Sequence, residues 1–234
     1  MGLDQRGLES RAPIVAAEIN KLCPPSVKNI PPSVKGEKIA DNVGKDGIAL
    51  LGNVLPARVC DDLVDYFINT DCYNAHVYSR SDKIPLRVAE IAKVFPFGSY
   101  ELTDIVNAPH LLELVNHPDI LSAAKNFLGC TPTVYSMNAL WSFPCEDDPQ
   151  RITQSFHRDV DDYRFLSLFI YLTDVNEHAG PHQYIPKTHT VAGLEGRLLK
   201  TLDSSYGVNE VEVKNSDAFK NVMALILSGE RYLP

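Results

Sequence analysis

The hydrophobic pattern of this chain changes from helical to strand-like near Thr131, and this change limits the fold more than any other feature. Before it, segments 109–115 and 118–128 each have a proline near the start, and Gly129 follows the second, which predicts two helices. After it, β-branched and aromatic runs separated by turns predict strands. The predicted strands cover 133–143, 152–159, 165–173, 183–185 and 208–213, and a short helix is expected over 194–200. Helices first and strands second predict an α+β fold with an antiparallel sheet or jelly roll at its core.

The beginning of the chain predicts an extension followed by the body of the domain. Segment 1–36 contains the sequence PPSVK twice, at 24–28 and 31–35, which favours an extended, polyproline-like surface strap or, alternatively, a docking segment for a partner. We place the domain at 37–234. Its first elements are expected to be a buried strand over 47–51 and an amphipathic helix over 56–67, with Pro56 at the first helical position.

Composition excludes several classes of protein. The net charge of -8 argues against a general nucleic-acid or anionic-membrane surface, so a small molecule or a protein is the expected partner. The five cysteines are scattered and contain no CxxC pair, which favours neither a disulfide framework nor a zinc site. The start of the chain has no signal-peptide pattern, and no apolar run approaches the roughly 20 residues of a membrane span. We therefore expect a cytoplasmic protein without a membrane segment.

His157 and Asp159 form the motif that points to chemistry. Side chains two residues apart on a strand share a face, so this imidazole and this carboxylate would both point into a barrel. Two histidines and one carboxylate on one face of an iron(II) ion leave coordination positions open, as in non-haem iron oxygenases. The alternative is a hydrogen-bonded pair at the end of a strand.

The sequence after this motif resembles the phytanoyl-CoA dioxygenase family. The resemblance comprises FLSLFIYLTD at 165–174 and GPHQYIPKTH at 180–189, and it extends over about 47–190. The second segment is similar to the family's Gly-Pro…Ile-Pro-Gly-Ser-His signature, with Lys187 and Thr188 in place of Gly and Ser.

The resemblance implies a fold, a cofactor and a reaction. The fold would be a double-stranded β-helix, a cupin-like jelly roll, preceded by helices. His157 and Asp159 would bind Fe(II), with 2-oxoglutarate as co-substrate and O2 as oxidant, in a dioxygenase that hydroxylates a small organic substrate. Met137 is similar in position to a family residue that lines the 2-oxoglutarate pocket; the alternative for Met137 is an ordinary core side chain.

The third iron ligand is where this chain departs from the family pattern. The family supplies a second histidine from a late strand and then an arginine for 2-oxoglutarate, whereas no histidine follows His189 here. Of His178, His182 and His189, we favour His182 as a ligand, because His189 matches the signature histidine that closes its strand. We do not assign Arg231 as the arginine that binds 2-oxoglutarate. We therefore expect the product of an incomplete gene that lacks the last barrel strands.

Two functions from different classes remain at this stage. One is an iron oxygenase, and the other is a catalytically inactive jelly-roll protein that binds a ligand or partner. A measurement of iron affinity distinguishes them, because only the oxygenase is expected to bind iron tightly.

Overall fold

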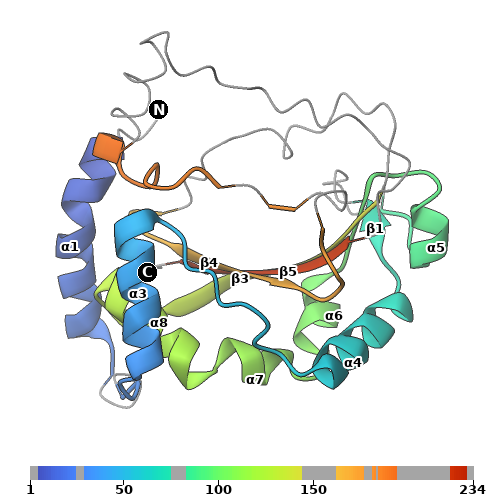
Figure 1. Cartoon of the computed structure of the whole chain (residues 1–234), viewed down its shortest axis with the longest axis horizontal. Helices are drawn as coiled ribbons and strands as arrows, with labels where there is room; N and C mark the ends of the chain where they lie inside the picture. Colours follow the sequence, from blue (N-terminus) through green and yellow to red (C-terminus); the bar gives the residue numbers. More distant parts are fainter. Residues whose placement is uncertain are drawn as a thin grey trace, which may run out of the picture.

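A computed structural model describes residues 5–24, 29–74, 83–143, 162–176, 181–182, 184–193 and 222–230. Within these ranges most helices precede the long strands, as Figure 1 shows. The elements, in chain order, are α1 (Gln5–Leu22), α3 (Val34–Asp46), α4 (Ala57–Ile68), β1 (Tyr73–Asn74), α5 (Val88–Ile91), β2 (Phe97–Ser99), α6 (Leu102–Val106), α7 (Leu111–Val115), α8 (Pro118–Leu128), β3 (Thr133–Ser142), β4 (Leu166–Tyr171) and β5 (Val222–Glu230).

The strands form one five-stranded antiparallel sheet. Its order is β1-β2-β3-β5-β4, so the last described strand lies between β3 and β4 and pairs with both. The register places Leu227 opposite Met137 on one side and opposite Leu168 on the other. The backbone of β5 is thus an interior strand of the sheet.

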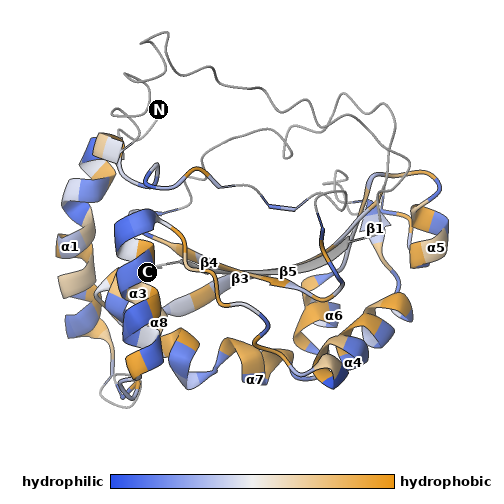
Figure 2. Ribbon diagram, viewed as in Figure 1, coloured by the Kyte–Doolittle hydropathy of each residue, from blue (hydrophilic) through white to orange (hydrophobic). Residues whose placement is uncertain are grey.

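Helices cover one side of this sheet and enclose the main core. In Figure 1, α4, α6, α7 and α8 lie on one side, and the segment after β4 runs along the other. Figure 2 shows hydrophobic residues on α4, α6 and α7 beneath the sheet. The sheet contributes Ala139 and Trp141 from β3, both almost fully buried, and Leu168 and Ile170 of β4 pack against the same cluster. This helix-covered antiparallel sheet confirms the α+β class, while the double-stranded β-helix stays a prediction.

Several predicted elements are confirmed with their boundaries. Helix α8 begins with Pro118 at its first position and ends at Gly129, whose φ of 76° is the left-handed conformation that glycine adopts readily. Helix α4 is confirmed, with Pro56 one position earlier, at the N-cap. Strands β3 and β4 confirm the predictions over 133–143 and 165–173. Helix α7 is shorter than predicted, because His110, with a φ of 62°, interrupts the helical backbone just before it.

Two predictions for the beginning of the chain are wrong. Half of the expected extended strap is α1, whose Ala16 and Ile19 pack with Leu128 and Cys130 at the end of α8. The PPSVK copies that suggested an extended strap lie after α1, and burial of its apolar face stabilises segment 5–22 as a helix. The second PPSVK copy starts α3 instead, because the Ser33 hydroxyl caps the helix by accepting a bond from the Gly36 N–H. The proposed boundary between 36 and 37 stays a prediction.

The expected strand over 47–51 is also wrong. Gly47 ends α3 in the left-handed conformation, with a φ of 79°, and the residues that follow form the connection to α4. Leu50 is 88% exposed, so the apolar run does not belong to the core. An apolar run of five residues does not by itself distinguish a strand from a surface connection.

The strand predicted over 183–185 is not found at Tyr184 and Ile185, which precede a turn at 186–189. The backbone N–H of Lys187 donates to the carbonyl of Asp46 at 2.8 Å, so this segment pairs with the end of α3 instead of extending the sheet. Predictions for 152–159, 194–200 and 208–213 lie outside the described residues.

Candidate functional site

The proposed iron ligands His157 and Asp159 lie outside the described residues, as does His178. The described strands β3 and β4 precede and follow this part of the chain. The site can therefore be built only from the sheet face that these strands present and from His182, His189 and Met137.

Within the described ranges, one face of the sheet is not covered by helices, and β4 shows which residues lie on it. Leu168 and Ile170 point to the helices and pack against the main core. Because side chains alternate along a strand, Phe169 and Tyr171 lie on the opposite face. Phe169 is 38% exposed there. An exposed aromatic ring on the open face of a sheet is a candidate wall for a small-molecule site.

His182 lies next to this aromatic face. Its ring packs against Phe169 in a tilted arrangement, with centroids 4.6 Å apart and planes at 32°. Its backbone N–H donates to the hydroxyl oxygen of Tyr171 at 2.7 Å. The two contacts fix both the backbone and the ring of His182 against β4, so an imidazole is placed on the helix-free face. The sequence analysis missed Phe169 and Tyr171, although the alternation of Leu168 and Ile170 with them is a signal that could have found them.

Met137 lies on the other face. It follows the same alternation as the buried Ala139 and Trp141, and it packs against the main core. The structure therefore does not bring Met137 and His182 together. The surroundings of Met137 are those expected for the alternative interpretation, an ordinary core side chain.

His189 belongs to the turn that holds the end of α3. Its Nε2 donates to the carbonyl oxygen of Gly44 at 3.2 Å, which fixes a proton on that nitrogen because a carbonyl only accepts. A Cβ added to Gly47 would come within 2.6 Å of the His189 Nδ1 and would also collide with the Tyr184 hydroxyl. These close contacts give His189 a structural environment at the surface of α3, consistent with its match to the signature histidine.

The ionisable groups with shifted pKa values lie in the main core or against it. Tyr100 donates to the carbonyl of Phe67 at 2.6 Å and accepts a bond from the Trp141 indole at 2.7 Å, and burial raises the pKa of Tyr100. Burial also raises the pKa of Cys72, whose thiol donates to the Leu86 carbonyl at 3.3 Å. Both are part of the scaffold of the sheet, not of its open face.

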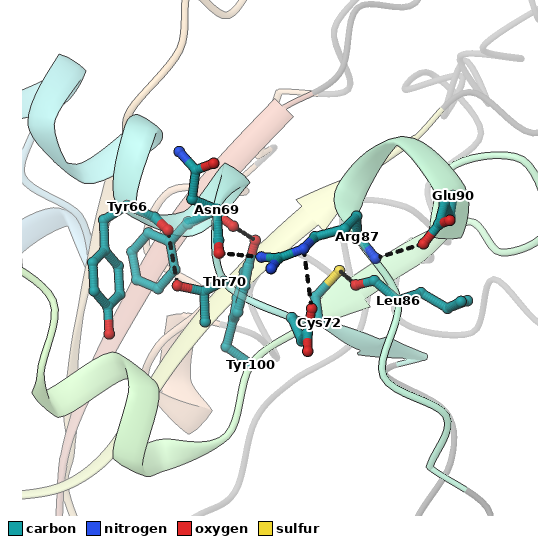
Figure 3. Close-up of polar contacts among 10 residues, drawn as sticks. Tyr66, Asn69, Thr70, Cys72, Leu86, Arg87, Glu90 and Tyr100 are labelled. Atoms are coloured by element: carbon teal, nitrogen blue, oxygen red, sulfur yellow. Dashed lines mark hydrogen bonds and ion pairs between the residues drawn. The ribbon is translucent and has the colours of Figure 1, made fainter.

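Arg87 ties together the segments around this network (Figure 3). Its guanidinium donates to the carbonyl of Asn69 and pairs with Asp71 at 3.2 Å, and its backbone N–H donates to Glu90 at 3.1 Å. The connection after α4 is thereby joined to the start of α5. All these side chains have structural partners, so we assign none of them to catalysis.

The described ranges do not by themselves provide an iron site. Among their residues, no three His, Cys, Asp or Glu side chains come close enough to hold a metal ion. Any iron site in this protein therefore takes at least one ligand from outside the described ranges, where the proposed ligands His157 and Asp159 lie. No helix in the described part of the chain has both the length and the apolar character needed to cross a membrane.

Comparison with known proteins gives one match. No curated protein and no solved structure matched the chain. The family described as phytanoyl-CoA dioxygenase (PhyH) matches residues 43–198, which is more than half of the chain. The matched range contains strands β3 and β4, the motif of His157 and Asp159, and the turn of His189. The chain therefore belongs to the phytanoyl-CoA dioxygenase family, whose members are in general iron(II)- and 2-oxoglutarate-dependent oxygenases.

Proposed function

We propose that this protein is an iron(II)- and 2-oxoglutarate-dependent dioxygenase that hydroxylates a small organic substrate. One observation carries the proposal: the family match over 43–198 includes the His157-Arg158-Asp159 motif, whose spacing suits two ligands on one strand. Nothing in the described structure favours the alternative of an inactive jelly-roll protein.

His157 and Asp159 are the proposed iron ligands. An imidazole nitrogen and a carboxylate oxygen are donors that suit iron(II), and they leave positions for 2-oxoglutarate, O2 and one further ligand. Bound iron(II), together with 2-oxoglutarate, would supply the oxidising power needed to hydroxylate a C–H bond. The chain's own part is to hold these ligands in place, to exclude water and to orient the substrate.

His182 is the proposed third ligand. Its position supports this role, since its backbone and ring are both held against β4 on the face that the helices leave open. A ligand held in place by its neighbours loses less side-chain freedom on binding a metal. Phe169, which packs against the same ring, would then line the site beside the iron.

The remaining parts of the proposal concern the fold of the domain and the location of the protein in the cell. We propose that β3, β5 and β4 form one sheet of a double-stranded β-helix within a domain over 37–234, preceded by an extension over 1–36. The helix-free face would point into that barrel. Met137 remains a proposed contact of 2-oxoglutarate, although its described neighbours are core residues. The described cysteines carry thiols, which agrees with the cytoplasm as the proposed location.

The test is an anaerobic titration of iron(II) into the full chain in the presence of 2-oxoglutarate. The iron chelate of 2-oxoglutarate has a visible charge-transfer band, which we expect in the wild-type protein and not in His157→Ala or Asp159→Ala. His117→Ala is the matched control, because His117 caps α8 far along the chain from the motif and should leave the band unchanged.

The same titration tests the third ligand. Loss of the band in His182→Ala, with unchanged thermal unfolding of the apoprotein, would support iron ligation by His182. A band of wild-type strength in that variant would exclude His182 as an iron ligand but would not affect the assignment of His157 and Asp159. If the wild-type protein binds no iron, the dioxygenase proposal is wrong and the inactive binding protein takes its place.

A further inference from the structure

Helix α1 is held to the end of α8 by a small hydrophobic cluster that contains two cysteines. Ala16 and Ile19 of α1 are buried with Leu128 and Cys130, and Cys23 packs against this cluster. Cys130 is only 1% exposed, and Cys23 is half-buried. Both cysteines carry thiols in this structure.

A polar contact fixes how the two segments meet. The Asn20 side-chain amide donates to the carbonyl oxygen of Gly129 at 2.9 Å. A Cβ built on Gly129 would lie 3.8 Å from the Cβ of Ala16, so the C-terminal half of α1 runs directly past this glycine. Cys130 follows Gly129 in the chain, and Cys23 lies three residues after Asn20, on the same side of the helix. Asn20 and Gly129, each close in the chain to one of the cysteines, are in contact, and both cysteines adjoin the same hydrophobic cluster.

Cys23 lies at the C-terminal end of α1. The helix ends at Leu22, the Cys23 N–H donates to the Ile19 carbonyl at 2.8 Å, and Pro24 follows. A disulfide needs Cα atoms about 4.4–6.8 Å apart, and a shift of Cys23 toward this separation would cost this terminal hydrogen bond but not those earlier in the helix.

The other described cysteines are poorer candidates. The Cys72 thiol donates to the Leu86 carbonyl, and burial raises its pKa to about 11, so little thiolate exists at neutral pH. Burial and the charge of Asp61 raise the pKa of Cys60 as well. Thiolate is the reactive form of cysteine, so neither is suited to react first with a peroxide, whereas the buried Cys130 has only the second step in the proposal below.

We propose that Cys23 and Cys130 form a reversible disulfide that fastens α1 to α8 when the protein meets a peroxide. The Cys23 thiolate attacks one peroxide oxygen and breaks the O–O bond, giving a sulfenic acid and, with hydrogen peroxide, one water. The Cys130 sulfur then attacks the Cys23 sulfur, a second water leaves and the S–S bond forms. The two thiols are oxidised by two electrons, and the peroxide is reduced by two. Added dithiol reverses the reaction.

The disulfide would join parts of the chain inside and outside the family match. Helix α1 precedes residue 43, where the match begins, and Cys130 lies within it. The Glu9 carboxylate of α1 also accepts a bond from the Val191 N–H at 2.8 Å, two residues after His189. Oxidation would therefore hold a helix that touches both the end of α8 and the turn of the signature segment.

Peptide mapping of the oxidised full-length protein tests the proposal. The native chain is treated with hydrogen peroxide, remaining thiols are alkylated, and the protein is digested without reductant by trypsin and chymotrypsin together. Chymotrypsin is needed because cleavage after Tyr135 and Trp141 separates Cys130 from Cys145. We expect a peptide pair that joins Cys23 to Cys130, two mass units lighter than the two reduced peptides, at a rate independent of protein concentration.

Variants make the result specific. The pair should form equally well in the double variant Cys60→Ser/Cys145→Ser and should be absent in Cys23→Ser. Cys23 is half-buried, so serine is accommodated there, and the circular dichroism of this variant is compared with that of the wild type. Three results would overturn the proposal: Cys23 oxidised beyond sulfenic acid while Cys130 is still alkylated, Cys23 joined to a different cysteine, or the pair formed only after unfolding in urea.

Discussion

His189 Nε2 donates to the carbonyl oxygen of Gly44 at 3.2 Å, in the last turn of α3. The two residues are 145 positions apart in the chain. The last carbonyls of a helix have no partner within it, so a side chain from elsewhere stabilises the helix end by supplying a donor. The signature turn of the family thus serves in this protein as the cap of an N-terminal helix.

Replacing His189 should therefore affect stability and not iron binding. We expect His189→Ala to lower the free energy of unfolding by about 1 kcal/mol, the net value of one hydrogen bond. Urea unfolding measures this, and the charge-transfer titration of the same variant should match that of the wild type. His189→Gln, which keeps an N–H donor, is the control and should lose less. Loss of the charge-transfer band in a folded His189→Ala would instead make this histidine an iron ligand.

Lys187 occupies a position better suited to glycine. Its φ is 68°, and a residue with a Cβ in the left-handed region costs about 1 kcal/mol relative to glycine. Its ion pair with Asp46, at 4.0 Å and largely exposed, adds little. We expect Lys187→Gly to have a higher melting temperature than Lys187→Ala, which loses the same ion pair but keeps the strain. Equal melting temperatures would contradict this account of the glycine in the family signature.

Alanine substitutions at Gly47 and Gly52 distinguish the cost of backbone strain from the cost of a steric clash. Both have a positive φ, 79° and 68°, so alanine is strained at either position by about 1 kcal/mol. A Cβ at Gly52 meets nothing within 4 Å, whereas a Cβ at Gly47 collides with Tyr184 and His189. We expect Gly47→Ala to cost about 2 kcal/mol more than Gly52→Ala in urea unfolding. Similar losses would mean that the signature turn does not lie against α3 as described.

Tyr100 should contribute more to stability than Tyr66. The Tyr100 hydroxyl is buried and makes hydrogen bonds to both Phe67 and Trp141, so phenylalanine there leaves the buried Trp141 indole N–H without its acceptor, at a cost of about 2 kcal/mol. The half-buried Tyr66 hydroxyl makes a 2.8 Å bond to the Asp104 carbonyl, and Tyr66→Phe should cost about 1 kcal/mol or less. Denaturant unfolding of both variants gives the comparison, and an equal or reversed order would contradict it.

Cys72 should make stability fall at alkaline pH. Burial, reinforced by the charge of Asp71, raises its pKa from 9.0 to about 11. A thiol whose pKa is raised by folding stabilises the fold fully below pH 9, and this contribution is lost as the pH rises from 9 to 11. We expect the urea midpoint to fall over this range, and to fall less in Cys72→Ala. Tyr100, whose pKa burial also raises, adds a decline in both proteins, so the difference between them isolates Cys72. Parallel pH profiles would contradict the prediction.

Local signals in the sequence determined the elements whose ends are marked by proline or glycine. Pro118 and Gly129 mark the two ends of α8, because proline at the first turn and glycine at the C-cap act through the backbone alone. The long apolar runs of β3 and β4 were predictable for a similar reason: β-branched and aromatic side chains fit a pleated sheet. The motif that identifies the family was also readable without a structure.

Long-range contacts determined the structure of the segments that were predicted incorrectly from the sequence. Segment 5–22 is a helix because its apolar face meets Leu128 and Cys130, more than a hundred residues away in the chain. Tyr184 and Ile185 do not form a strand, because the following turn is bound to α3. Neither partner is visible in a local window, since burial depends on which surfaces meet in three dimensions.

For the candidate site, the sequence by itself determined the family and supplied the proposed ligands: an imidazole and a carboxylate at strand spacing, His157 and Asp159, within the matched range. Only the tertiary structure decided which side chains lie on which face of the sheet. It placed His182 against Phe169 on the open side of the sheet and Met137 among the core side chains on the other. The physical reason is that alternation along a strand sorts residues into two sets, but only the packing of helices on one side determines which set is buried.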